Sequence, residues 1–291
     1  FLFITLSAKG QVLQWSNPTK IRGSAVFSKV LGENKHGVYI LRYRNRFYTK
    51  SVILEKYNHL LSLDQSKIID LKNARLTKIY LLQDSILLVK SQYNRLSATN
   101  TLIAQYYSYN LKPKGKPITL VETPSEEYGD KGDFRLRISD NQMLISLLYT
   151  EKDEEKKLVV HHRLYNAQLQ LQRQKDWVMP YDATELYLQD YVVLNKGAIA
   201  ILARHTQRKR KKVLEKTHNL FYLNQHNELS DFVVSDTLDI KNAEIIYNRY
   251  ADDFKVVGLY GLRDEFGLEG ILFYQLDRAK KQGQLQINPF E

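Results

Sequence analysis

The stretch from Phe134 to Leu171, FRLRISDNQMLISLLYTEKDEEKKLVVHHRLYNAQLQL, decides the fold. It reads as a strand, a polar turn, an apolar strand, a charged hairpin tip, a third strand ending in Leu-Tyr-Asn, and a fourth strand. Its apolar residues come in short runs bounded by polar turns, which is typical of strands rather than helices. The stretch therefore predicts a small antiparallel sheet of four strands.

Two sequence marks repeat this unit along the chain. The first is an Asn or Asp behind a large residue at the end of the third strand, at Asn58, Asn110, Asn166, Asn224 and Asp277. The second is a polar turn before the second strand, at Asp84, Asp140, Asn195 and Asp252. Asn and Asp side chains bond to nearby backbone and tolerate left-handed angles, so they close tight turns.

Both marks recur in steps of 52 to 58 residues. A repeated unit of four strands is the signature of a propeller blade. We therefore predict an all-β protein of propeller-type blades, with about five repeat units of roughly 55 residues that can form an incomplete propeller. One irregular β-sandwich is the alternative.

The first ten residues read as the remnant of a signal peptide. Phe1 to Leu6 is apolar, and Ala8 and Gly10 supply small residues before a cut at Gln11. A plain first strand is the alternative. We expect residues 1–10 to be this remnant and residues 11–291 to form the propeller-like domain, which places the mature protein outside the cytoplasm.

The composition is basic, which suits an anionic partner but does not by itself identify one. The net charge is +11, from 43 basic and 32 acidic residues, and a basic surface attracts nucleic acids, acidic glycans or anionic lipids. The chain has no cysteine, which excludes disulfides and thiolate metal sites. No apolar run is long enough to span a bilayer, so we expect no transmembrane segment.

The sequence offers no catalytic or metal-binding motif. The nucleophile-elbow, zinc-protease and P-loop patterns are all absent. His161 and His162 are the one adjacent histidine pair, and neighbours in a strand point to opposite faces, so they are poorly placed to share a metal. We predict no catalytic residue, no metal and no cofactor.

The sharpest charged feature is a basic hairpin between the second and third strands of the fourth unit. Its candidate ligand-binding residues are Arg204, Arg208, Lys209, Arg210, Lys211 and Lys212. Charged hairpin tips also occur simply because they stay solvated and discourage edge pairing. Contact with a polyanion and a plain solvated tip therefore both fit.

The order of Asp140-Asn141-Gln142 turn, apolar strand, charged hairpin and Leu164-Tyr165-Asn166 resembles the large envelope β-propeller proteins of Bacteroidetes-type bacteria. The resemblance implies an extracytoplasmic location in the periplasm, at the outer membrane or outside the cell. It supplies no catalytic residues.

We therefore expect a non-catalytic binding or scaffold protein of the bacterial cell envelope, which contacts another envelope protein or a polyanionic glycan. One alternative is a carbohydrate-active enzyme on a propeller fold. The other is a nucleic-acid-binding protein that uses the hairpin at residues 204–212, which an extracytoplasmic location disfavours.

The repeat also predicts where ligands bind. In a four-stranded antiparallel sheet, the hairpin between the second and third strands lies at the same end as the linker to the next sheet. We call this the long-loop end and expect function there, at segments such as Thr150 to Lys157 and His205 to Lys216. The opposite, short-turn end carries the Asp and Asn turns near Asp140 and Asn195, which serve closure.

Overall fold

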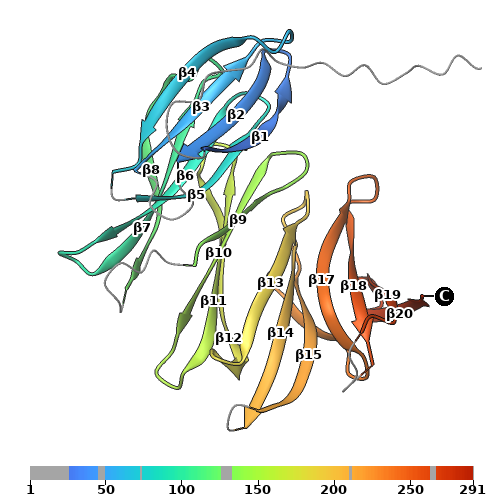
Figure 1. Ribbon diagram of the computed structural model, residues 1–291. Coiled ribbons are helices and arrows are strands. Elements are labelled where there is room, and N and C mark those ends of the chain that lie inside the picture. The colour runs from blue at the N-terminus through green and yellow to red at the C-terminus, as the bar shows by residue number, and fades with distance from the viewer. Residues whose placement is uncertain are drawn as a thin grey trace, which may run out of the picture. The chain divides into compact units, whose positions relative to one another are not determined.

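The computed structural model describes residues 26–44, 50–72, 74–125, 133–209, 212–262 and 267–290. These residues form 20 strands in five antiparallel sheets of four strands, with no helix (Figure 1). In every sheet the strands follow one another in sequence order. The predicted all-β fold of blade-type sheets is therefore confirmed. The predicted leader at residues 1–10 lies outside the described residues.

The first sheet consists of β1 (Val26–Asn34), β2 (Gly37–Arg44), β3 (Ser51–Tyr57) and β4 (Leu63–Asp70). The second consists of β5 (Ala74–Leu81), β6 (Ile86–Asn94), β7 (Thr99–Tyr107) and β8 (Pro113–Pro124). The third consists of β9 (Arg135–Ile138), β10 (Leu144–Lys152), β11 (Lys157–Asn166) and β12 (Leu171–Asp182). The fourth consists of β13 (Leu186–Val193), β14 (Ile199–Lys209), β15 (Lys212–Leu223) and β16 (Leu229–Ser235). The fifth consists of β17 (Asp239–Asn248), β18 (Asp253–Gly261), β19 (Gly270–Asp277) and β20 (Gln282–Pro289).

The chain divides into two compact units. Residues 1–132 contain the first two sheets, and residues 133–291 contain the other three. None of the described residues lies in a helix, so no helix among them is long and apolar enough to cross a membrane.

The repeated Asn residues close the turns between third and fourth strands, as predicted. Asn58 Oδ1 accepts hydrogen bonds from the backbone N–H groups of Leu60 (3.0 Å) and Ser62 (2.9 Å). Asn166 and Asn224 accept the equivalent pair of bonds in the third and fourth sheets.

The second sheet departs from this register. The turn there is closed by Ser108, whose backbone N–H donates to Lys112 O at 2.8 Å and whose carbonyl accepts from Leu111 at 2.9 Å. The mark at Asn110 therefore lies two residues beyond the equivalent position. A Ser hydroxyl makes the same kind of local bond as an Asn amide, though more weakly, so the turn survives the exchange.

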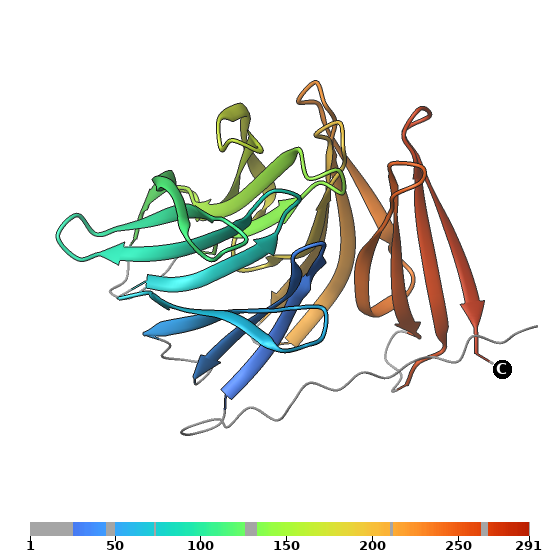
Figure 2. The ribbon, with the colours of Figure 1, turned by 90° about the horizontal axis from the view of Figure 1, so that it is seen from above.

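Each unit buries apolar side chains between neighbouring sheets. In residues 133–291, Ile201 and Phe221 of the fourth sheet pack against the third sheet. Leu202 and Leu220 project from the opposite face and pack against the fifth sheet, which lies face to face with the fourth (Figure 2). In residues 1–132, Leu54 and Leu88 belong to a similar cluster between the first two sheets.

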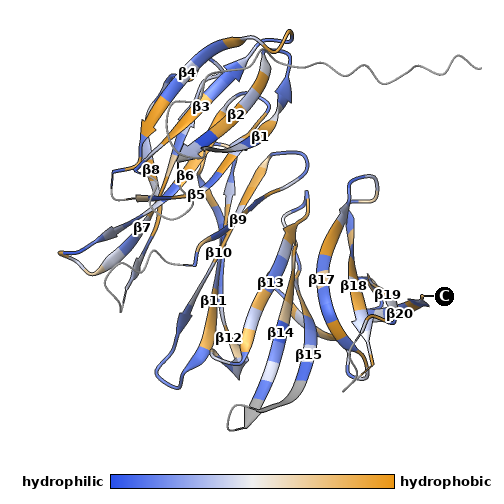
Figure 3. Ribbon diagram, viewed as in Figure 1, coloured by the Kyte–Doolittle hydropathy of each residue, from blue (hydrophilic) through white to orange (hydrophobic). Residues whose placement is uncertain are grey.

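Apolar and polar residues mix along the strands (Figure 3). In the fourth sheet both faces of β14 are buried from Ile199 to Ala203. A strand buried on both faces reads as a continuous apolar run rather than as an alternation. Full burial of each Ile or Leu side chain in this run contributes about 2 kcal/mol.

The first strand is bulged in four of the five sheets. Register shifts occur between Val30 and Gly32 in β1, and between Leu76 and Lys78 in β5. Equivalent shifts lie before Asp190 in β13 and before Asn242 in β17. A bulge bends its strand, increases the local twist and re-aims a side chain.

Asp190, directly after the bulge of β13, links three sheets. Its Oδ1 lies 2.7 Å from Arg137 Nη2 in the third sheet and accepts a bond from its neighbour Tyr191 N at 2.8 Å. Its Oδ2 accepts a hydrogen bond from Ile245 N in the fifth sheet at 3.2 Å. One carboxylate therefore connects β9, β13 and β17.

The two adjacent histidines of the third sheet point to opposite faces, as predicted. His161 stacks on Tyr149 with ring centroids 4.6 Å apart, and its Nδ1 lies 3.0 Å from Asp176. His162 is fully buried, and its Nε2 is 3.0 Å from the hydroxyl of Ser146. Burial, with smaller contributions from Arg173 and Arg163, lowers the pKa of His162 to about 3.

Removing the Asp190 carboxylate should destabilise residues 133–291. We expect Asp190→Ala to lower the free energy of unfolding by about 2 kcal/mol, because it removes bonds to a charged acceptor and leaves two backbone donors unpaired. Urea denaturation of both proteins measures the free energy of unfolding. The control Glu154→Ala, at an exposed hairpin tip, should change stability by less than about 0.5 kcal/mol. An equally small effect of Asp190→Ala would show that the link is dispensable.

His162 should make the fold sensitive to acid. Because its folded pKa of about 3 lies below the unfolded value of 6.5, its neutral form favours folding above pH 6.5, and that advantage is lost as the pH falls from 6.5 toward 3. At pH 5 the loss should be about 2 kcal/mol. Urea unfolding at pH 7 and pH 5 should show a smaller difference for His162→Gln than for the wild type.

The exposed His226 provides the control for this measurement. His226→Gln should retain the wild-type difference in stability between the two pH values. If His162→Gln retains it as well, His162 is not the source of the acid sensitivity.

Candidate functional site

The basic hairpin predicted from the sequence lies between β14 and β15. The two strands pair as far as Lys209 opposite Lys212, which confirms the hairpin. Arg204, Arg208 and Lys209 lie in β14, whereas Arg210 and Lys211 lie outside the described residues. Arg204 is the one member of the predicted set whose side chain is described, and its guanidinium carbon lies 5.6 Å from the ring centroid of Tyr187.

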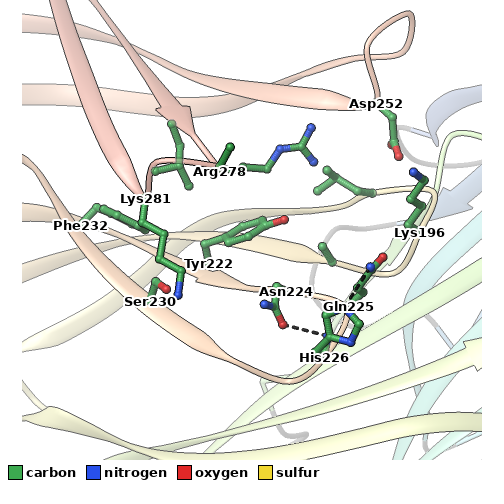
Figure 4. A pocket seen from close by; sticks show the side chains of 14 residues that line it. Lys196, Tyr222, Asn224, Gln225, His226, Ser230, Phe232, Asp252, Arg278 and Lys281 are labelled. Carbon is green, nitrogen blue, oxygen red and sulfur yellow. Dashed lines mark hydrogen bonds between the residues drawn. The ribbon is translucent and has the colours of Figure 1, made fainter.

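A pocket of about 430 Å³ lies between the fourth and fifth sheets at their short-turn end (Figure 4). Two turns of the fourth sheet line it with Leu194, Lys196, Ala198, Asn224, Gln225 and His226. Two turns of the fifth sheet line it with Asp252, Leu276, Arg278, Ala279 and Lys281. Its volume is typical of small-ligand sites. The sequence predicted function at the opposite, long-loop end.

Three cationic side chains line the pocket. Lys196 comes from the fourth sheet, whereas Arg278 and Lys281 come from the turn after β19 in the fifth. Arg278 Nε lies 3.6 Å from Asp253, a distance that leaves the guanidinium only loosely paired. Cations that converge on one hollow raise the local concentration of anions there.

The turn that carries two of these cations is built by Asp277. Its Oδ1 accepts hydrogen bonds from the backbone N–H groups of Ala279 and Lys280, both at 3.0 Å. These bonds, the one from Lys280 first, lower the pKa of the Asp277 carboxyl. Lys281 ends the turn in the left-handed region, with φ of 52°. The last Asn/Asp mark of the sequence therefore positions Arg278 and Lys281.

Aromatic and aliphatic groups line the pocket between the cations. Tyr222 and Phe232 contribute rings from β15 and β16, and the buried Leu276 contributes an aliphatic surface. Tyr222 stacks on Phe254, with centroids 6.0 Å apart and planes inclined by 28°. Phe254 is buried, so this contact fixes the plane of the Tyr222 ring. In Figure 4, Tyr222 lies near the centre of the pocket, between Arg278 and Asn224.

The wall formed by Asp252 is rigid because its carboxylate is already engaged. Asp252 Oδ1 accepts hydrogen bonds from Asn195 N at 2.9 Å and from the Tyr247 hydroxyl at 2.8 Å. Burial, followed by the bond to Asp252, raises the pKa of Tyr247 to about 12, so this phenol keeps its proton at neutral pH. Asn195 Oδ1 in turn accepts a bond from Asn141 N in the third sheet at 2.9 Å.

The remaining polar groups come from the turn between β15 and β16. Asn224 is occupied with the turn itself, since its Oδ1 accepts from His226 N at 2.8 Å. The exposed His226 lies beside Gln225, with 3.2 Å between their side-chain nitrogens. His226 is therefore the imidazole that the pocket presents to a ligand.

No group of three His, Cys, Asp or Glu residues suited to a metal ion is found in the part of the chain that the structure describes. The lining of the pocket is cationic and partly aromatic, with one carboxylate among its described residues. Such a set can hold an anionic ligand that also has an apolar face.

The sequence did not single out Lys196, Arg278 or Lys281 as site residues. Lys196 lies 82 residues before Arg278 in a separate turn, and no local pattern joins it to Arg278 and Lys281. The repeat itself was the usable signal, because it aligns the turns after Asn195 and Asp277 at one end of adjacent sheets.

No family model and no curated protein matches this sequence. Solved structures of low similarity do match. A chimera of apocarotenoid oxygenase (ACO) and RPE65 has a TM-score of 0.47 and 8% identity, covering 88% of this chain and 59% of that one. A mutant of the Synechocystis apocarotenoid oxygenase has a TM-score of 0.42 and 8% identity, with coverages of 87% and 58%. For the cobalt-substituted Synechocystis ACO the TM-score is 0.44, with the same identity and coverages.

The prediction of a non-catalytic scaffold protein of the cell envelope is wrong against these matches, because the proteins found are oxygenases. They agree better with the alternative of an enzyme on a propeller fold. The chain spans less than two thirds of each of these structures. At 8% identity and TM-scores below 0.5, they assign no activity, substrate or metal to this chain.

Proposed function

We propose that this protein is a carbohydrate-active enzyme that acts on an acidic sugar held between the fourth and fifth sheets. The single observation that carries the proposal is the meeting of three cations with two aromatic rings in one pocket of about 430 Å³. A sugar acid has the complementary chemistry, because each residue combines a carboxylate with hydroxyl groups and an apolar C–H face.

The ligand's carboxylate would bind Arg278 and the two lysines. Arginine recognises carboxylates through paired N–H donors, and lysine adds a compact positive charge. The C–H face of the sugar would lie against Tyr222, whose ring plane is fixed by Phe254. A neutral sugar would lack the ionic contacts, and a small inorganic anion would not use the rings.

Elimination is the reaction class that this set of side chains serves best. Hydrolysis of a glycosidic bond ordinarily uses two carboxyl groups, and Asp252 is the one carboxylate among the described lining residues. In an elimination, a base removes the proton next to the substrate carboxylate, and the electron pair forms a C=C bond as the C–O bond to the leaving sugar breaks. The leaving oxygen then takes a proton from a general acid or water.

The cations would stabilise the charge that spreads onto the substrate carboxylate during proton removal. His226 is the candidate base, since it is exposed at the pocket and Asp252 is engaged by Asn195 and Tyr247. Tyr222, whose phenol lies inside the pocket, is the candidate proton donor to the leaving oxygen.

Neutralising the cations should weaken binding of an acidic sugar. We expect the triple variant Lys196→Gln, Arg278→Gln, Lys281→Gln to bind a galacturonate trisaccharide at least about tenfold more weakly, since each charge-assisted bond contributes about 1.5 kcal/mol or more. Isothermal titration calorimetry measures the affinity, and a neutral trisaccharide should not bind. The matched control replaces the exposed Lys114, Lys116 and Lys255 by Gln, which removes the same charge elsewhere.

Turnover is followed through the ultraviolet absorbance of the C=C bond conjugated to the carboxylate. His226→Ala should lose this signal while it retains trisaccharide binding. If the pocket variant and the lysine control variant bind the trisaccharide with equal affinity, the site is refuted. Release of reducing ends without the absorbing product would replace elimination by hydrolysis.

We also propose that the protein works outside the cytoplasm, as the resemblance to envelope propellers of Bacteroidetes-type bacteria implies. The apolar run from Phe1 to Leu6, followed by Ala8 and Gly10, supports this proposal. N-terminal sequencing of the mature protein should find a start at or after Gln11. A mature chain that retains Phe1 to Leu6 would contradict it.

A further inference from the structure

A second cationic surface lies on the fourth sheet at its long-loop end. Tyr187 in β13 and Arg204 in β14 are cross-strand neighbours. The guanidinium carbons of Arg204 and of Arg135, from the third sheet, lie 5.6 Å and 5.5 Å from the centroid of the Tyr187 ring. Tyr187 is 55% exposed, so the two arginines meet at the surface around one phenol.

The ion pairs of this surface leave it with excess positive charge. Arg135 pairs with Asp133 at 2.9 Å, and Lys216, on β15 beside these residues, pairs with Asp239 at 3.1 Å. Within the described ranges no ion pair of Arg204 is found, and its Nε is buried without a hydrogen-bond partner. Among the described residues, Arg204 is therefore the cation of this surface that lacks a carboxylate partner.

The neighbouring His218 supports this assignment. It lies opposite Arg204 across the β14–β15 pair and is 2% exposed. Burial, followed by the charges of Lys216 and Arg204, lowers its pKa to about 4. The histidine is thus neutral at pH 7 and adds no positive charge beside Arg204.

We propose that Arg204, Arg135 and Tyr187 form a remote binding surface for an acidic polysaccharide, distinct from the pocket that holds the reacting sugar. This inference rests on the proposed function, because it takes the same substrate class and adds that the substrate is a polymer. The surface lies about 20 Å from the pocket, because Arg204 is six residues along the chain from the lining residue Ala198 and a strand rises about 3.3 Å per residue.

Two sites on one polymer raise its affinity without any new contact. Once one segment is bound, a second segment of the same chain is present at high effective concentration. Guanidinium groups suit this task, because they hold carboxylates with paired donors and are only weakly hydrated. A trisaccharide is too short to reach both sites, so chain length separates their contributions.

The test compares a galacturonate trisaccharide with long-chain polygalacturonate on the full chain. The wild type should bind the polymer at least about tenfold more tightly per site than the trisaccharide. Arg135→Gln with Arg204→Gln should remove this gain and leave trisaccharide affinity unchanged. The pocket variant Lys196→Gln, Arg278→Gln, Lys281→Gln should lose the trisaccharide and retain weak polymer binding. Lys114→Gln with Lys255→Gln is the charge-matched control for the arginine pair.

The outcomes separate this inference from the proposed function. The wild type could bind the trisaccharide and show no higher affinity for the polymer, or the higher affinity could persist in Arg135→Gln with Arg204→Gln. Either result overturns the remote surface and leaves the pocket intact. Loss of trisaccharide binding in the control variants would instead undermine the pocket. The pocket variant is also tested with a single-stranded oligonucleotide. If the oligonucleotide displaces polygalacturonate and binds this variant more tightly than polygalacturonate does, the surface belongs to nucleic acid and the proposal is overturned. Circular dichroism confirms that each variant is folded.

Discussion

The carboxylate of Asp190 is the constraint on which the arrangement of residues 133–291 depends. It accepts bonds from Arg137 in the third sheet, from its own strand and from Ile245 in the fifth sheet. The bulge that precedes it in β13 aims the side chain toward the neighbouring first strands. Apolar burial supplies most of the stability but is non-directional. The Asp190 bonds are directional, so they fix how the three sheets are aligned.

A second set of directional bonds aligns the short-turn end. Asn141 donates to Asn195, and Asn195 donates to Asp252, so the repeated turn residues of three successive sheets are joined. This alignment brings Lys196 of the fourth sheet to the same hollow as Arg278 and Lys281 of the fifth. The residues that close the turns therefore also create the pocket.

The repeat in the sequence was sufficient to predict the sheets, because Asn and Asp turns leave a regular local pattern. Asn58, Asn166 and Asn224 close turns as predicted, and the shift to Ser108 in the second sheet is a tolerated exchange. The link through Asp190 could not be predicted, since a bulge has no fixed sequence and its partners lie more than 50 residues away. The pocket was missed for the same reason. The basic hairpin attracted attention because its charges are consecutive, whereas those of the pocket converge only in the folded chain.

A crystal structure of the protein with a galacturonate trisaccharide tests the central claim most directly, because it locates the ligand rather than inferring its place. The account predicts density between the fourth and fifth sheets, with the sugar carboxylate bonded to Arg278 or the two lysines and a sugar face against Tyr222. Density at another surface with this pocket unoccupied, obtained at a trisaccharide concentration that saturates binding in solution, would contradict it.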